Sequence, residues 1–231
     1  MSLFTISDLH LPLGIDKPMD VFGKGWDNYV NRIYENWQKN VGDDDTVVLG
    51  GDFSWATYLD QSYKDFEFLH SLSGRKILLK GNHDYWWTTM NKLGEFIKKS
   101  GFDNIYFLQN NVYTCGETAI CGTRGWSLDI SAPDDKKIYE RELIRLRLSL
   151  ESAVKTGCGE IYVFTHYPPV TNQLQRTRFH EILTQFGVKK CIYGHLHGAS
   201  HKSAFEGETD GVEYILASAD YLEFSPILLK K

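Results

Sequence analysis

Polar residues of the kinds that bind metal ions recur along this sequence directly after short apolar runs. They follow five such runs, and in chain order they are Asp8, His10, Asp52, Asn82, His83, Asp84, His166, His195 and His197. Five of the eight histidines lie in these turns, whereas His70 and His180 fall within predicted helices. Taken singly, an aspartate in a turn has an ordinary structural explanation as a turn or capping residue. The set as a whole indicates one shared site.

Carboxylate, imidazole and amide oxygen are ligands of divalent or trivalent ions such as Mn, Fe, Zn or Co, and no cysteine lies among these residues. Seven of them are candidate ligands, namely Asp8, His10, Asp52, Asn82, His166, His195 and His197. Seven ligands are too many for one ion but suit two ions that share a carboxylate. Two ions roughly 3.5–4 Å apart activate a bridging water and clamp both oxygens of an in-line displacement. The residues therefore predict a two-metal hydrolytic centre.

Alternating strands and helices are predicted to position these residues. The predicted buried strands are Leu3–Ile6, Thr46–Leu49, Lys76–Leu79, Ile161–Thr165 and Cys191–Tyr193. The predicted helices are Trp26–Asn40, Tyr63–Leu72, Trp86–Ser100, Lys136–Lys155 and Asn172–Phe186. This alternation favours an α/β fold with a mainly parallel sheet, whose strands bring ligands to the edge formed by their carboxyl ends.

Two stretches depart from the alternation. Ile105–Cys121 has the pattern of three short strands in succession, and Ala204–Ala217 that of a late pair around Thr209–Gly211. They predict a second sheet that contains antiparallel pairs. Gly23–Gly25 and Ser127–Asp135 are predicted loops, not domain boundaries. With no repeat, linker or shift in composition, we predict a single domain over residues 1–231.

The polar clusters also resemble the five ordered motifs of the calcineurin-like metallophosphoesterases. In order, the matching residues are Asp8-Leu9-His10, Gly51-Asp52, Gly81-Asn82-His83-Asp84, His166 and Gly194-His195-Leu196-His197. The match runs from residue 8 to residue 198 and covers most of the chain. The resemblance implies a four-layer αββα sandwich of two mixed sheets covered by helices. It also implies metal-dependent hydrolysis of a phosphate mono- or diester by a hydroxide that bridges two ions.

Specific roles follow from the resemblance, position by position. One metal ion would be held by Asp8, His10, Asp52 and His197. The other would be held by Asp52, Asn82, His166 and His195, so that Asp52 bridges the two. His83 matches the family histidine that lies beside the phosphate and either protonates the leaving oxygen or stabilises the transition state.

The sequence departs from the protein Ser/Thr phosphatase branch of the family. That branch carries Asp-Arg-Gly shortly after its Gly-Asp, where this chain has Phe53-Ser54-Trp55-Ala56. Trp55 stands where the branch has the aspartate that orients its catalytic histidine. Asp84 is a candidate to orient His83, and a purely structural Asp84 is an equal alternative. The segment Thr165-His166-Tyr167-Pro168-Pro169 is closer to bacterial phosphodiesterase-like members.

Residues outside the motifs have two interpretations each. Arg124, in a loop after a predicted strand, could offer its guanidinium fork to a substrate phosphate oxygen or pack within the loop. Tyr85, Trp86 and Trp87 favour core packing at a helix start, with stacking on a base or sugar as the alternative.

The amino-acid composition excludes few classes of function. The 231 residues are 42% hydrophobic and 24% charged, with a formal net charge of −5. These values are typical of globular proteins and indicate neither a nucleic-acid partner nor a membrane partner. No basic segment followed by an apolar stretch precedes Leu3, and no apolar run has the length of a membrane span. The four cysteines show no CxxC spacing and are expected to be small buried thiols, which favours the cytoplasm.

Two functional hypotheses remain at this stage. The first is a phosphoesterase that acts on a small organic or nucleotide ester, and the sequence leaves its oligomeric state open. The second is a catalytically silent binding scaffold of the same fold. Such scaffolds tend to lose ligands or the catalytic histidine, and this chain retains all of them.

Overall fold

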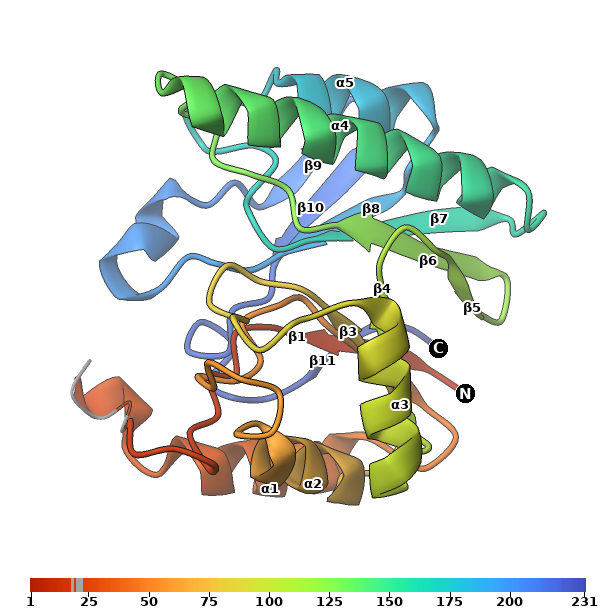
Figure 1. Cartoon of the computed structure of the whole chain (residues 1–231). Coiled ribbons are helices and arrows are strands. Elements are labelled where there is room, and N and C mark those ends of the chain that lie inside the picture. Colours follow the sequence, from red (N-terminus) through yellow and green to blue (C-terminus); the bar gives the residue numbers. More distant parts are fainter. Residues whose placement is uncertain (18, 20–22) are drawn as a thin grey trace.

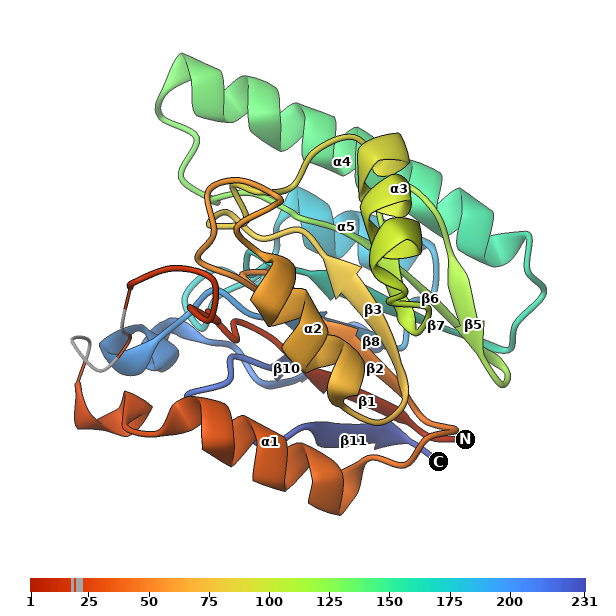
Figure 2. The same ribbon diagram turned by 60° about the horizontal axis from the view of Figure 1, so that its bottom comes forward.

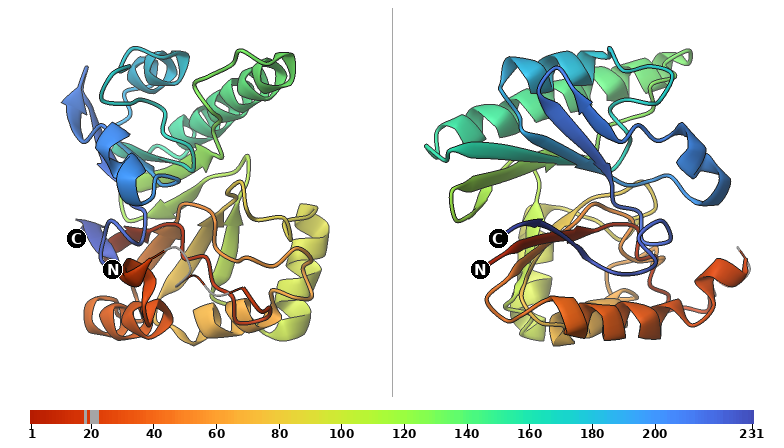
Figure 3. Two further views of the ribbon diagram at one scale, coloured as in Figure 1. Left: turned by 90° about the vertical axis from the view of Figure 1, so that its left-hand side faces the viewer. Right: turned by 180° about the vertical axis from the view of Figure 1, so that it is seen from behind.

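In the computed structural model, two β-sheets are stacked face to face, with helices on both outer sides (Figure 1). The structure describes residues 1–17, 19 and 23–231. The first sheet has the strand order β11-β1-β2-β3-β4, and the second has the order β5-β6-β7-β8-β10-β9. Helices α1, α2 and α3 cover the first sheet, and α4 and α5 cover the second (Figures 1 and 3). This arrangement confirms the predicted four-layer αββα sandwich.

The elements have the following bounds. The strands are β1 Leu3–Ile6, β2 Thr46–Leu49, β3 Arg75–Leu79, β4 Ile105–Leu108, β5 Tyr113–Cys115, β6 Thr118–Thr123, β7 Glu160–Thr165, β8 Lys190–Tyr193, β9 Gly207–Thr209, β10 Val212–Leu216 and β11 Ile227–Lys230. The helices are α1 Tyr29–Asn40, α2 Tyr63–Ser71, α3 Met90–Ser100, α4 Pro133–Val154 and α5 Arg178–Gln185. Within the described residues, short 3-10 helices cover Lys24–Trp26 and Gly198–Ser203.

Both sheets are mixed, as the family resemblance implied, but β4 joins the first sheet and not the second sheet predicted for Ile105–Cys121. In the first, β1 to β4 run parallel and β11 joins β1 antiparallel. In the second, β6, β7, β8 and β10 run parallel, with β5 and β9 antiparallel at the edges. The central strands are buried on both faces because each sheet packs on its partner and on helices. Leu3, Val48 and Ile77 of the first sheet meet Ile120 and Phe164 of the second in the inner core.

The two sheets are joined at the carboxyl ends of their parallel strands. After β10 the chain leaves the second sheet, and Ser7, just beyond β1, donates its N–H to the Ala217 carbonyl at 2.7 Å. The Ala219 N–H returns a bond to the Ser7 carbonyl at 2.9 Å. The chain then continues to β11 beside β1, so the two termini lie close together (Figures 1 and 2). Strand ends from both sheets therefore face one region.

The predicted strands agree with the structure to within one residue where the apolar pattern is strong, but several predicted helix starts were wrong. The third helix begins at Met90 instead of Trp86, because Thr89 caps it by accepting the Lys92 N–H. The fifth begins at Arg178 instead of Asn172, with Thr177 as its cap. Each capping oxygen satisfies an N–H that the first helical turn leaves unpaired.

Other boundaries were also wrong. The first helix begins at Tyr29, after a 3-10 turn that covers Lys24–Trp26 of the predicted loop and helix start. Helix α4 begins at Pro133, inside the predicted loop Ser127–Asp135, because proline suits the first helical turn. Strand β11 had not been predicted.

The predicted late pair is a confirmed antiparallel hairpin of β9 and β10. Its two linking residues, Asp210 and Gly211, have φ values of 49° and 81°. Two successive left-handed residues are what a two-residue hairpin turn requires.

Cys115, Cys121 and Cys191 are buried free thiols, as expected, and Cys158 is a half-buried one. Of the helices in the described ranges, none combines the length and the apolar character needed to cross a bilayer.

One charged residue lies inside the first sheet. The side chain of Lys76, in β3, is fully buried, and its Nζ donates to the Leu72 carbonyl at 2.5 Å. Burial lowers the pKa of Lys76 to about 8 from 10.5, although Asp103 and Asp43 oppose the shift. Below pH 8 the folded protein therefore bears the full cost of a buried ammonium group.

We predict that Lys76→Met raises the free energy of unfolding at pH 7 by on the order of 1–2 kcal/mol. The gain should shrink between pH 8 and 10.5, because there the wild-type folded state loses its proton while the unfolded state keeps it. Urea unfolding across this range measures the difference. Lys98→Met, at an exposed position in α3, serves as the control and should show no such pH dependence. A constant gain at every pH would contradict this explanation.

Candidate metal centre

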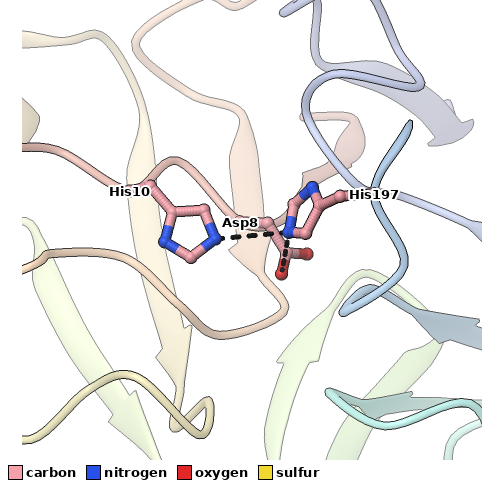
Figure 4. Close-up of side chains that lie close together, drawn as sticks. All are labelled: Asp8, His10 and His197. Carbon is pink, nitrogen blue, oxygen red and sulfur yellow. Dashed lines mark hydrogen bonds and ion pairs between the residues drawn. The ribbon is translucent and has the colours of Figure 1, made fainter. Parts of the chain in front are cut away.

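All seven predicted ligands lie at the strand ends where the two sheets meet. Their donor atoms include two groups, each with its atoms within 4.8 Å of one another, namely Asp8, His10 and His197, and Asp8, Asp52 and His166. The first group comes from the turn after β1 and the loop after β8 (Figure 4). Residues almost two hundred positions apart in the chain thus lie side by side at the junction of the two sheets.

The first group places two imidazole nitrogens against each other. His10 Nε2 lies 3.2 Å from His197 Nε2, and His197 Nε2 lies 3.4 Å from Asp8 Oδ1 (Figure 4). Asp8 and His10 are almost fully buried. Burial would raise the pKa of Asp8, but the hydrogen bond from His197 and the nearby imidazoles hold it below its ordinary value.

A second set of donors lies beside the first. Asn82 Oδ1 lies 2.7 Å from His166 Nε2 and 2.9 Å from His195 Nδ1, and these two nitrogens are 3.3 Å apart. The three side chains come from the ends of β3, β7 and β8. One amide oxygen and two imidazole nitrogens therefore converge on one point.

Asp52 lies between the two sets. Its Oδ2 is 3.8 Å from His10 Nε2 and 3.5 Å from His166 Nε2. Its Oδ1 accepts the backbone N–H of His83 at 2.7 Å. Asp52 Oδ2 thus faces both sets of donors, while Asp52 Oδ1 holds the loop that carries His83.

These donors fit metal ions. Ligands bound at 2.0–2.2 Å from one ion lie about 3 Å from their neighbours, which is the spacing seen within each group. Burial and the charge of Asp8 raise the pKa of Asp52 to about 8. A cation beside Asp8 and Asp52 would offset the free-energy cost of burying their negative charges, because buried charges need a partner. The donors are oxygen and nitrogen only, as the sequence predicted.

Four of the ligand residues hold a left-handed backbone. Asp8, His10, Asp52 and His195 have φ values of 60°, 47°, 50° and 73°. Such values are uncommon for residues other than glycine, and they concentrate at functional sites where the surrounding structure enforces them.

A left-handed turn at His195 separates the directions of the two histidines in the last motif. An extended segment would point His195 and His197 the same way. Instead the chain turns between them, so that His195 faces Asn82 while His197 faces His10. The two histidines therefore belong to different groups.

Two glycines leave space for the carboxylates. A Cβ at position 81 would lie 2.0 Å from Asp52 Oδ1, and a Cβ at position 194 would lie 2.1 Å from Asp8 Oδ2. Both contacts are too short for any side chain, so Gly81 and Gly194 are required by the ligands beside them.

Asp84 supports the loop that carries Asp52. Its buried carboxylate accepts the backbone N–H groups of Asp52 at 2.9 Å, Phe53 at 2.9 Å and Gly81 at 2.7 Å. It also accepts the indole N–H of Trp86 at 3.0 Å. Among the described residues, none of its hydrogen bonds reaches the His83 ring. The contacts favour the structural alternative for Asp84 over a direct role in orienting His83.

Trp55 packs against the ring of His83. The two ring centroids are 4.8 Å apart, and Trp55 also stacks on His10 at 4.4 Å with an interplanar angle of 23°. The half-buried His83 ring is therefore confined by packing. Trp55 had been noted only as a departure from the phosphatase branch, and its contact with both histidines had not been predicted.

Asp220 was missed by the sequence reasoning. Its Oδ1 lies 2.9 Å from His197 Nδ1, and its Oδ2 accepts the Gly198 N–H at 3.0 Å. A carboxylate on the second nitrogen of a metal-binding histidine fixes the ring and its tautomer. The rule that polar residues follow strands also applies to Asp220, which lies four residues beyond β10, but the family motifs end before it.

Arg124 lies beside the centre without pairing to it. Its carbonyl accepts the N–H of His166 at 3.0 Å, and its half-buried guanidinium lies over the Trp126 ring at 4.4 Å. Trp86 and Trp87 belong to the core cluster under the first sheet, which confirms core packing for this pair. Tyr85 is exposed.

Comparisons with known proteins agree with this geometry. The family model described as calcineurin-like phosphoesterase matches residues 1–199. No curated protein matches the sequence significantly. Among solved structures, a protein of unknown function from Aquifex aeolicus is similar, with 20% identity, a TM-score of 0.53, and coverage of 98% of this chain and 95% of its own.

Two further structures share the fold. The phosphopantetheinyl hydrolase from Mycobacterium tuberculosis has 13% identity and a TM-score of 0.53, covering 100% of this chain and 95% of its own. A protein from Thermus thermophilus has 10% identity and a TM-score of 0.54, covering 87% of this chain and 85% of its own. At these identities the likeness concerns the fold.

We predict that Asp220→Asn weakens metal binding by about 10–100-fold, the usual cost of losing a carboxylate behind a ligand histidine. The measurement is a titration of chelator-treated protein with Mn²⁺, in which the electron paramagnetic resonance signal reports the concentration of free Mn²⁺. Asp210→Asn is the matched control, because Asp210 pairs with His180 at 3.0 Å away from the centre. Equal affinities in both variants would show that Asp220 does not support the site.

Proposed function

The chain belongs to the calcineurin-like phosphoesterases, which are metal-dependent hydrolases, and from this premise we propose that it cleaves a small organic or nucleotide phosphate ester at a two-metal centre. The observation that carries the proposal is the complete donor set, arranged in two groups with Asp52 between them. The substrate is proposed to be a mono- or diester.

Each ion has a proposed set of ligands. One set is Asp8, His10, Asp52 and His197, and the other is Asp52, Asn82, His166 and His195. When bound, two such ions supply an activated water and positive charge for the phosphate oxygens. The donor types suit Mn, Fe, Zn or Co.

His83 is the proposed acid–base residue. Its backbone N–H is anchored on Asp52 Oδ1, and its ring is confined by Trp55. Burial and the neighbouring His166 lower the pKa of His83, so the ring is neutral at pH 7 and still donates one N–H. In the neutral form that N–H can stabilise charge on the phosphate by a hydrogen bond, and the imidazolium form can protonate the leaving oxygen and return to the neutral ring.

Three further parts of the proposal concern residues around the centre. Asp84 is proposed as a positioning residue that acts through the Asp52 loop and not as a proton donor. Arg124 is proposed to contact substrate oxygens that extend from the centre. The buried free thiols suit a reducing cytoplasm, and we propose a single domain over residues 1–231 that acts there.

The test of the proposed function is an assay of purified protein with Mn²⁺ on an aryl phosphate monoester and an aryl phosphodiester. We expect turnover of at least one ester, about two equivalents of bound metal by elemental analysis, and loss of both in Asp52→Ala. The absence of turnover across several ester classes, with metal shown to be bound, would leave the scaffold hypothesis in its place.

We predict that His83→Ala lowers kcat by roughly 10²–10⁴-fold, the usual contribution of a positioned acid or base. Metal content should stay at the wild-type value, because the anchor on Asp52 is the backbone N–H of residue 83 and survives the substitution. Steady-state kinetics and elemental analysis of the same preparation measure both quantities. Normal turnover in this variant would show that another group serves the leaving oxygen.

A further inference from the structure

A cavity rich in positive charge lies between the two sheets beside the metal centre. Its volume is about 260 Å³, and its walls come from the ends of β3 and β4 on one side and from β6 and α4 on the other. Four cationic side chains line it, namely Lys80, Arg124, Arg141 and Arg145. The only carboxylate among the lining residues is that of Glu142.

Two of the four cations are already partnered. Arg145 Nη1 donates to Glu142 Oε1 at 2.8 Å, and Arg141 Nε approaches the same oxygen at 3.4 Å. The other oxygen of the buried Glu142 accepts a hydrogen bond from Thr123. Both oxygens of Glu142 therefore have partners within the protein, and this carboxylate holds α4 against β6.

Lys80 and Arg124 have no such partner. Both are half-buried, and within the described residues neither side chain makes an ion pair or a hydrogen bond. The one carboxylate in the cavity wall, Glu142, already pairs with Arg141 and Arg145. Two half-buried cations that line the cavity without an ion pair of their own are complementary to an anion.

Two residues that line the cavity, Lys80 and Arg124, neighbour proposed ligands of the metal centre. Lys80 lies two residues before the proposed ligand Asn82, and the carbonyl of Arg124 holds the backbone of the proposed ligand His166 at 3.0 Å. Pockets for drug-sized ligands measure about 300–1,000 Å³, so a cavity of this size suits one small group of a larger molecule. An ester at the centre would have to extend past Arg124 to fill it.

We propose that this cavity binds a second phosphate group of the substrate, so that the preferred substrate is a small molecule with two phosphates, one of which is cleaved. The Arg124 guanidinium supplies a planar fork for two oxygens, and Lys80 supplies a point charge. The inference rests on the proposed function, because the first phosphate must lie at the metal centre.

The kinetic test compares bisphosphates of linear alkanediols, from two to six carbons, with the monophosphates of alkanols of the same length. For at least one length we expect the bisphosphate to show a KM about tenfold or more below that of its monophosphate, as one charge-assisted contact provides. Lys80→Met should remove this preference, Lys80→Arg should retain most of it, and Lys98→Met on α3 should leave it unchanged. Turnover of monophosphates without any preference for a bisphosphate would overturn the inference while the proposed function stood.

A second measurement does not depend on turnover. Crystals of the metal-loaded protein soaked in tungstate, a phosphate mimic with strong anomalous scattering, should show an anion between Lys80 and Arg124. The Lys80→Met crystals should lack this anion. Tungstate at the metal centre alone would overturn the second phosphate site, whereas tungstate in the cavity of a protein that hydrolyses no ester would show that the anion site exists and the proposed activity does not.

Discussion

The structure depends on keeping two carboxylates, Asp8 and Asp52, side by side and out of water. Both are buried to within 1% of full burial, and no arrangement of neutral side chains would compensate their charges. The chain surrounds them with imidazoles that come from both sheets. Each neighbouring feature then has a physical reason, from the absent side chains at Gly81 and Gly194 to the left-handed turns that direct the ligands inward.

A second layer of residues holds the first in place by different means. Asp84 binds the backbone of the Asp52 loop, Asp220 binds the ring of His197, and Trp55 confines His83 by packing. The backbone bonds hold the Asp52 loop in a fixed position. The aromatic contact limits the motion of the His83 ring without engaging either nitrogen. The ring therefore keeps both nitrogens available, which a carboxylate partner would prevent.

Local patterns predicted the strands and the polar residues that gather at their ends, whereas the four-layer sandwich followed from the family resemblance. Apolar runs defined the buried strands, and the polar residues after Ile6, Leu49 and Leu79 followed from where parallel strands end. Helix starts failed because Thr89 and Thr177 cap helices later than the apolar periodicity begins. The contacts of Trp55, the hydrogen bonds of Asp84 and the whole role of Asp220 depend on how distant loops meet, and no local pattern contains that information.

The crossing of the chain from β10 in the second sheet to β11 in the first sheet has a consequence for the order of assembly in the cell. The first proposed ligand is at position 8, its neighbour His197 leaves the ribosome late, and the carboxylate that hydrogen-bonds to His197 follows only at position 220. Until then β1 lacks its antiparallel neighbour β11 and exposes an unpaired edge. A nascent chain thus holds four of the seven proposed ligands from residue 82 onward without being able to close the site. Metal uptake by the proposed centre would be tied to the completion of synthesis, and a prematurely terminated chain would lack both a finished first sheet and the complete set of donors.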